Sequence, residues 1–327
     1  MNRGKVKEAI LQRTIFKRIT YKNQETVSSS EVGSDAAVLE NKDEVTVIST
    51  NPVTYNFKGM EKLAIASAVN NVVAKGGCPR SVEVSILLPE RYKETALKKM
   101  LESLNLFCRE YGIDIVGGHT EVTTVVNTPV INVTAVGYAL RKNVVTKKRL
   151  KADMDIVMTK YIGLPATLII RDIKRDELRE KFSENFINHV NDFDKYYSII
   201  DEGRLALSHG VTCMHDVSRG GIFKALWEMA EYYGFGFEVD VDRILVKQET
   251  IEFCEMFNLN PYEILSTGVL LMLAEDGERL ADIFLEAGIP ASVIGKTNAG
   301  NDRLIIRNDE RGFITPPRGD ETDKIVS

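Results

Sequence analysis

The stretch Tyr111–Ala139, YGIDIVGGHTEVTTVVNTPVINVTAVGYA, predicts two strands of a mixed α/β fold. A helix is expected to end at Gly112, and a short apolar strand then runs into the pair Gly117-Gly118. After a loop, a second strand begins at Val130 and alternates apolar and polar residues, the period-two pattern of a strand with one buried face. Because glycine has no Cβ, the backbone can approach a ligand closely at the double glycine.

Three polar residues, His119, Thr120 and Glu121, come directly after this double glycine. The pattern therefore places proton-transfer and metal-ligand groups at the expected end of a strand, where mixed α/β folds often carry their chemistry. A tight turn with solvated side chains explains the same residues equally well. Both interpretations stay open at this point, and the other motifs of the chain decide between them.

Composition and charge limit the class of protein. The 327 residues exceed one compact core of typical size, which predicts two domains. With 44% hydrophobic residues and a net charge of −5, the chain is typical of a soluble globular protein and not of a nucleic-acid binder. No apolar run reaches the roughly 20 residues that span a bilayer, and the N-terminus has no secretory signal pattern. The four cysteines have no CxxC pair, so we expect reduced thiols in a cytoplasmic protein without a membrane partner.

Polar residues also stand at strand ends and in a helix of the first half. The segment GSDAAV places Asp35 where a turn meets a strand, and the strand EVTVIST is expected to end at Asn51. The apolar helix that opens at Gly59 contains Asn70 and Asn71. Asparagine is a mediocre helix former, and a buried one needs hydrogen-bond partners. These side chains either satisfy neighbouring backbone groups or line a polar pocket.

The segment Met214–Gly221, MHDVSRGG, leads into a strongly amphipathic helix. Free backbone N–H groups and the dipole at a helix N-terminus favour anions, and an arginine beside them supports a phosphate. The residues at this N-terminus are Ser218, Arg219, Gly220 and Gly221. Asp216 or Ser218 could instead cap the helix, but capping does not explain the Arg-Gly-Gly sequence, so we favour an anion site.

In this order, the motifs GSDAAV, STN, VNNVVAKGG, VGGHTEV and MHDVSRGG resemble the PurM-like (aminoimidazole ribonucleotide synthetase) superfamily from Gly33 to about Arg307. The pattern is most similar to the hydrogenase maturation factor HypE and AIR synthase-related proteins. The resemblance implies an α+β fold of two domains. It implies an N-terminal arm or flap over residues 1–30 and an ATP-binding domain over 31–145, whose mixed sheet forms a β-barrel with a second copy. An α+β domain over 150–327 completes the expected homodimer subunit.

The resemblance also implies ATP between the domains and Mg²⁺ beside its phosphates. The expected metal ligands are Asp35, Asn51, Asn71 and Glu121. The expected contacts to ATP or another anionic group are Asp35, Asn51, Asn71, Gly117, Gly118, Thr120, Ser218, Arg219, Gly220 and Gly221. The expected catalytic residues are His119, Glu121 and Asp216.

Two departures from the family pattern bear on function. Asn51 and Asn71 stand where the family usually has Asp, and Mg²⁺ prefers charged oxygen ligands. The chain ends at Ser327, whereas HypE ends in a cysteine that accepts a carbamoyl group, and a hydroxyl is a far poorer nucleophile than a thiolate. We expect an ATP-dependent enzyme that activates an amide or carbonyl oxygen by phosphoryl transfer, with hydrogenase maturation proteins as partners. The alternative is a non-catalytic nucleotide-binding or scaffold homologue with a weakened metal site.

Overall fold

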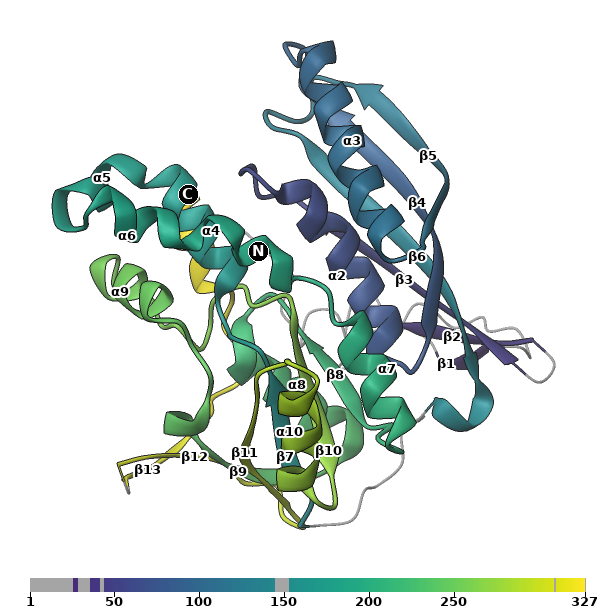
Figure 1. Cartoon of the computed structure of the whole chain (residues 1–327), viewed down its shortest axis with the longest axis vertical. Helices are drawn as coiled ribbons and strands as arrows, with labels where there is room; N and C mark the ends of the chain where they lie inside the picture. Colours follow the sequence, from purple (N-terminus) through teal and green to yellow (C-terminus); the bar gives the residue numbers. More distant parts are fainter. Residues whose placement is uncertain (1–25, 29–35, 42–43, 145–152, 309, 327) are drawn as a thin grey trace.

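The computed structural model describes residues 26–28, 36–41, 44–144, 153–308 and 310–326 (Figure 1). Most of the expected N-terminal arm, Asp35 and Ser327 lie outside these described residues. The described strands form two sheets, and each sheet takes its strands from one half of the chain. Helices pack on both sheets, so the α+β fold predicted from the sequence is confirmed.

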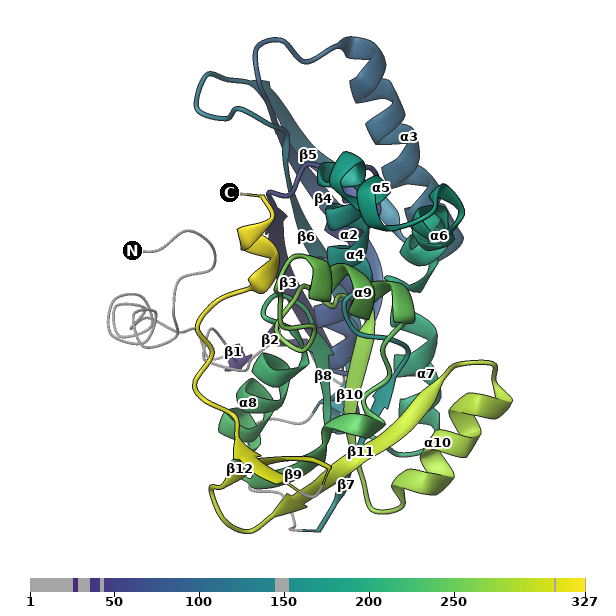
Figure 2. The same ribbon diagram turned by 90° about the vertical axis from the view of Figure 1, so that its left-hand side faces the viewer.

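The first sheet has the strand order β1-β2-β3-β6-β4-β5. Its strands are β1 (Thr26–Ser28), β2 (Ala37–Asn41), β3 (Glu44–Val53), β4 (Cys78–Leu88), β5 (Asp114–Val122) and β6 (Val130–Leu140). Only β4 and β5 run parallel; the other neighbours are antiparallel. Helices α2 (Met60–Ala74) and α3 (Glu94–Glu110) cover one face (Figure 2), and α2 packs against β3, β4 and β6.

The second sheet has the order β13-β12-β9-β11-β7-β10-β8. Its strands are β7 (Asp155–Thr159), β8 (Met214–Val217), β9 (Gly236–Asp240), β10 (Val269–Ala274), β11 (Ala291–Asn298), β12 (Arg303–Arg307) and β13 (Glu310–Phe313). The α-helices of this half are α4 (Leu164–Ile173), α5 (Arg175–Lys181), α6 (Glu184–Asn188), α7 (Ile200–Ser208), α8 (Gly221–Tyr233), α9 (Gln248–Met256) and α10 (Gly277–Glu286). The short 3-10 helices are η2 (Arg141–Asn143), η3 (His189–Tyr196), η4 (Val241–Arg243) and η5 (Glu321–Lys324).

The two halves share a hydrophobic core. Helix α2 contacts β8 and α7 as well as the first sheet. One buried cluster therefore combines residues such as Val69 of α2 with Ile200 of α7 and Met214 of β8. A second cluster lies under α8 and includes Ile222 and Phe237. None of the described helices has the length and apolar character needed to cross a membrane.

Two strands are longer than the sequence predicted. Strand β3 continues through Asn51 and Pro52 to Val53, and β5 continues through the double glycine to Val122. Proline fits here because the described residues of β2 pair with β3 only from Glu44 to Ile48, so no described strand pairs with this edge of β3 at Pro52. The expectation that Asn51 and the His-Thr-Glu residues stand at strand ends was therefore wrong, because they lie inside strands.

The C-terminal sequence PPRGDETDKIVS predicts an extended tail, and this prediction is wrong. Asp320, Thr322 and Ile325 are buried, and Ile325 belongs to the core cluster that both halves share. Figure 2 shows the segment rising from β12 and β13 to the helical turn η5 beside the first sheet. The prediction failed because the residues PPRGDETDKIVS carry little apolar pattern of their own, and their burial depends on partners far away in the sequence.

Candidate functional site

The first group of site residues lies between β3 and α2. Ser49 and Asn51 are two residues apart on β3, so their side chains share the face that carries buried Val47 and Val53. This face packs against α2, where Asn71 Nδ2 donates to Ser49 Oγ at 2.9 Å. Asn51 and Asn71 are both half-buried. The structure therefore brings these two predicted residues to the same face of the first sheet.

Asn70 has a different role from its neighbour. Its side chain is fully buried, its Nδ2 donates to the Tyr197 carbonyl at 2.8 Å, and its Oδ1 accepts from the Ile199 N–H at 3.1 Å. The chain between η3 and α7 thus obtains two hydrogen bonds from α2. Asn70 therefore fits the first interpretation, because its side chain satisfies neighbouring backbone groups. Asn71 is left for the second interpretation, a polar site.

His119 and Glu121 lie on the opposite face of the same sheet. His119 is in register with Ser85 and Asn132, whereas the row that contains Asn51 runs through buried residues to Gly118. The two side chains are 65% and 53% exposed, and His119 Nε2 is 3.3 Å from Glu121 Oε2. Strands β6 and β4 separate β3 from β5, a distance of roughly 14 Å at three strand spacings. Within one chain, the structure does not bring Glu121 together with Asn51 and Asn71.

The double glycine of β5 has a structural reason. A Cβ on Gly118 would stand 2.0 Å from the Val84 carbonyl oxygen, and its φ of 150° disfavours other residues. A Cβ on Gly117 would meet only the Glu83 side chain, at 3.5 Å. Close approach of the backbone is thus real at Gly118, but the neighbour in this structure is strand β4.

The second group of site residues surrounds the N-terminus of α8. Gly220 is the N-cap with φ 87°, so neither Asp216 nor Ser218 caps the helix. The Gly220 N–H donates to Asp320 Oδ2 at 2.7 Å, and Arg219 Nη2 donates to Asp323 Oδ1 at 2.7 Å. The donors predicted to hold a phosphate therefore contact two carboxylates of the C-terminal segment.

Tyr55 joins the two groups. It follows β3 in the chain, its hydroxyl donates to Asp323 Oδ1 at 2.7 Å, and its ring lies 4.6 Å from the Arg219 guanidinium. Burial raises the pKa of Tyr55, and the charge of Asp320 adds to this effect. Burial also raises the pKa of Asp320, although hydrogen bonds from Thr322 and Gly220 oppose the shift. The segment after β3 and the N-terminus of α8 thus meet in a partly buried, charged contact.

Buried charged residues that the sequence analysis missed lie between β8 and α8. Asp216 and His215 on β8 are each 3% exposed. His215 Nε2 lies 3.5 Å from Glu228 Oε2, and Lys224 Nζ lies 3.7 Å from Glu228 Oε1. Lysine and glutamate within the largely buried helix IFKALWEMAEYY were a signal that could have found this cluster. Asp216 follows His215 on β8, so its side chain points to the other face of the strand, where it is also screened from solvent.

The expected Mg²⁺ prefers charged oxygen ligands, and the described residues offer few of them at the predicted positions. Asn51 and Asn71 supply amide oxygens, which carry no charge, and the Asn71 amide already donates to Ser49. Among the described residues, no group of three or more His, Cys, Asp or Glu side chains could hold a metal ion. These residues alone therefore do not fit a magnesium site, and Asp35 lies outside them.

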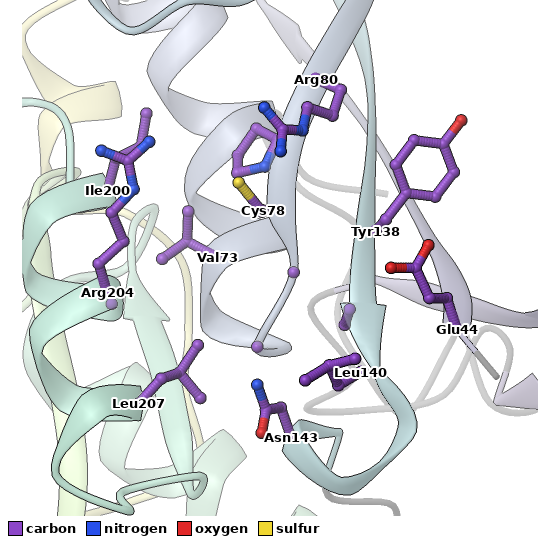
Figure 3. Close-up of a pocket in the computed structure, with 15 residues that line it drawn as sticks. Glu44, Val73, Cys78, Arg80, Tyr138, Leu140, Asn143, Ile200, Arg204 and Leu207 are labelled. Carbon is purple, nitrogen blue, oxygen red and sulfur yellow. The ribbon is translucent and has the colours of Figure 1, made fainter.

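A cavity of about 330 Å³ lies between the end of α2, the start of β4 and α7. Figure 3 shows Cys78 and Arg80 of β4 and Arg204 of α7 along its walls. None of the predicted site residues lines it.

Two family models match the chain in sequential order. The N-terminal domain of AIR synthase related protein matches residues 33–139, and its C-terminal domain matches residues 156–324. The chain belongs to the AIR synthase-related family. This confirms the resemblance inferred from the five motifs. Curated relatives span most of the chain at low identity. A putative hydrogenase expression/formation protein of Methanocaldococcus jannaschii is 24% identical over 98% of this chain and 97% of its own length.

Other relatives in the family differ in activity. The carbamoyl dehydratase HypE of Rhizobium leguminosarum bv. viciae is 23% identical over 78% of this chain and 73% of its own length. The thiamine-monophosphate kinase of Pyrococcus horikoshii is 25% identical over 76% of this chain and 74% of its own length.

Solved structures share the fold. A chain from the crystal structure of a HypE–HypF complex superposes with a TM-score of 0.76 at 20% identity, over 94% of this chain and all (100%) of that one. HypE in complex with ATP gives a TM-score of 0.71 at 19% identity, over 83% of this chain and 84% of that one. AaThiL in complex with AMPPCP and TMP gives 0.68 at 20% identity, over 89% and 91%.

Proposed function

We propose that this protein binds ATP and uses it to activate an amide or carbonyl oxygen by phosphoryl transfer, in a HypE-like role. The observation that carries the proposal is the shared fold, over most of the chain, with HypE in complex with ATP. The second complex, of AaThiL with AMPPCP and TMP, supports nucleotide binding by the same fold. The residues proposed for the site are those that meet where β3 and Tyr55 approach the N-terminus of α8.

Phosphoryl transfer of this kind requires little covalent chemistry from the protein itself. A phosphate placed on oxygen turns it into a leaving group, and the protein supplies positioning and charge neutralisation. Asn51 and Asn71 are proposed to contact ATP phosphates through their amides. Arg219 and the Gly220 N–H are proposed to bind an anionic group of the second substrate. Asp35 stays a proposed phosphate or metal contact, and Asp216 stays a proposed proton-transfer group.

A homodimer is part of the proposal. All nine residues of β5 are exposed, and they form an unpaired sheet edge with Val116 63% and Val122 60% exposed. An exposed apolar edge strand pairs readily with another chain. A second copy on the face of the sheet opposite α2 would cover His119 and Glu121. Thr120 and the double glycine would then join the interface, and the proposed acid–base role of the His-Glu pair would apply inside it. Hydrogenase maturation proteins are the proposed further partners, by analogy with the HypE–HypF complex.

A second candidate function is a non-catalytic nucleotide-binding or scaffold protein. The observation that favours it is that the described residues contain no group of three or more His, Cys, Asp or Glu side chains that could hold a metal ion. Two amides in place of carboxylates weaken the attraction for Mg²⁺.

Titration calorimetry with ATP, with and without Mg²⁺, tests the proposal. We expect ATP to bind, and we expect Asn51→Asp with Asn71→Asp to strengthen the effect of Mg²⁺ on binding. Asp35→Ala is expected to abolish Mg²⁺-dependent binding. An absence of ATP binding in both conditions would refute the enzymatic proposal. If the two Asp substitutions leave Mg²⁺ affinity unchanged, the metal assignment fails.

A further inference from the structure

The C-terminal segment places carboxylates on the groups that the proposed function assigns to an anionic ligand. Asp320 accepts from the Gly220 N–H, and Asp323 accepts from Arg219, each at 2.7 Å. Phosphate and carboxylate groups use the same donors at helix N-termini and on guanidinium groups. A phosphate cannot bind these donors while the two carboxylates hold them.

We propose that residues 320–325 form a displaceable plug that competes with a phosphate group for Arg219 and the N-terminus of α8. The inference rests on the proposed function, because that function assigns an anionic ligand to this location. In this proposal the C-terminal segment regulates access to the subsite. It does not deliver a reactive C-terminal residue.

The burial of Asp320 makes the docked plug costly to maintain in its charged form. Asp320 is only 9% exposed, and a buried carboxylate loses hydration that its hydrogen bonds must replace. The pKa of Asp320 is raised, with burial as the main cause, which indicates that the replacement is incomplete. Arg219 and Asp323 keep 24% and 20% of their side chains exposed, so a dissolved anion can reach the contact. The plug is therefore held in a balance that a competing anion can shift.

The segment also has a point of rotation and defined anchors. Gly319 stands directly before the plug, and no atom lies within 4 Å of the place where its Cβ would be, so the chain has room to turn there. The Glu321 N–H donates to the Glu263 carbonyl, and the Leu265 N–H donates to Thr322 Oγ1 at 3.1 Å. Release of the plug breaks these bonds together with those of the two aspartates.

Release would also loosen the contact between the two halves. Asp323 accepts from Tyr55, which follows β3, and from Arg219, which precedes α8, so one carboxylate links both halves. Binding of a phosphate at Arg219 is therefore coupled to freeing Tyr55 and the segment after β3.

The test titrates the full-length protein with inorganic triphosphate by calorimetry and follows hydrogen exchange of residues 319–326. Wild-type protein is expected to exchange faster in this segment when triphosphate is saturating. The variant with Asp320→Asn and Asp323→Asn is expected to bind triphosphate at least about tenfold more tightly, which corresponds to removal of a modest competing free energy. The matched control, with Glu286→Gln and Glu310→Gln, removes the same charge at two exposed sites and is expected to bind like wild type.

Each outcome decides the proposal. Equal or weaker triphosphate binding by the aspartate variant, or no change in exchange of wild-type residues 319–326 on adding triphosphate, overturns the plug. The exchange measurement needs no substitution, so it holds even if the variant fails to fold. ATP titrations of the same proteins separate the two proposals. If the aspartate variant binds triphosphate more tightly than wild type but no protein binds ATP, the plug is supported and the nucleotide proposal is refuted. If ATP binds but wild type and the aspartate variant bind triphosphate equally well, the nucleotide proposal is supported and the plug is refuted.

Discussion

At the residue scale, the adjacent asparagines of α2 show what the sequence can and cannot predict. Both were recognised as polar residues inside an apolar helix. Consecutive helix residues point about 100° apart, so Asn70 faces the other half of the chain while Asn71 faces β3. The sequence identified the pair, but the division of roles depends on Tyr197 and Ser49, which are distant in the chain.

We predict that Asn70→Ala lowers the free energy of unfolding by about 2–4 kcal/mol, because the Tyr197 carbonyl and the Ile199 N–H each lose a buried partner. Asn71→Ala, the matched control, is expected to cost less than about 1 kcal/mol, because only one half-buried hydrogen bond is lost. Urea denaturation measures both values. Similar losses for the two variants would contradict the assignment of Asn70 to the backbone.

Thiol reactivity gives a second prediction at this scale. Burial raises the pKa of Cys108 to about 12 and of Cys254 to about 12, and it also raises the pKa of Cys213. A thiol with a raised pKa forms its reactive thiolate only at high pH, so these three stay protonated at pH 8. Cys78 is half-buried and lines the cavity beside Arg80. We expect one thiol to react rapidly with a disulfide reagent at pH 8, and Cys78→Ser to remove that phase. Persistence of the rapid phase in Cys78→Ser would show that a buried thiol is accessible.

At the element scale, strands with strong local patterns were predicted with their full bounds, and strands that depend on a neighbour were not. The residue patterns predict strands at Gly236–Asp240 and Arg303–Arg307, and β9 and β12 have these bounds. Strand β5 extends past its apolar start because β4 pairs with it in parallel as far as Val122. The sequence pattern predicts a buried helical stripe of Leu97, Leu101, Leu104, Cys108 and Tyr111 on α3, and this prediction is only partly right. Leu101 is 45% exposed, and Met100 takes the buried position instead.

We predict that Gly118→Ala destabilises the β4–β5 pair by more than about 1 kcal/mol, because the new Cβ meets the Val84 carbonyl and the backbone conformation is strained. Gly117→Ala is the matched control, because its Cβ meets only a movable glutamate side chain. Thermal denaturation compares the two variants. If Gly118→Ala is as stable as Gly117→Ala, the double glycine serves a ligand and not the sheet.

The candidate site shows the same limit at the element scale. The sequence selected Asn51, Asn71 and the Arg219-Gly220 motif. The structure places the two asparagines on one face of the first sheet and places Arg219 against Tyr55, which follows β3. The sequence could not predict that His119 and Glu121 occupy the opposite face of the sheet. That outcome depends on the register of β5 with β4, and a shift by one residue would reverse it.

At the scale of the whole molecule, the open face of the first sheet predicts self-association. In the part of the chain that the structure describes, helices α2 and α3 cover one face of this sheet, and edge strand β5 is exposed along its length (Figure 2). We expect light scattering after size exclusion to give twice the chain mass of 36.6 kDa. Tyr138 of β6 is 42% exposed and is in register with Thr46, so its side chain lies on the open face. In a two-fold interface each substitution appears twice, so Tyr138→Glu is expected to bring two like charges to one contact and shift the protein to monomers. Leu106→Glu is the matched control, because this leucine is 64% exposed on α3, on the face that helices already cover. A monomeric wild type at micromolar concentration would refute the dimer, and dissociation by both variants would place the interface elsewhere. Because Tyr138 lies on the same face of the sheet as His119 and Glu121, loss of the dimer in Tyr138→Glu would also show whether ATP binding requires the paired form.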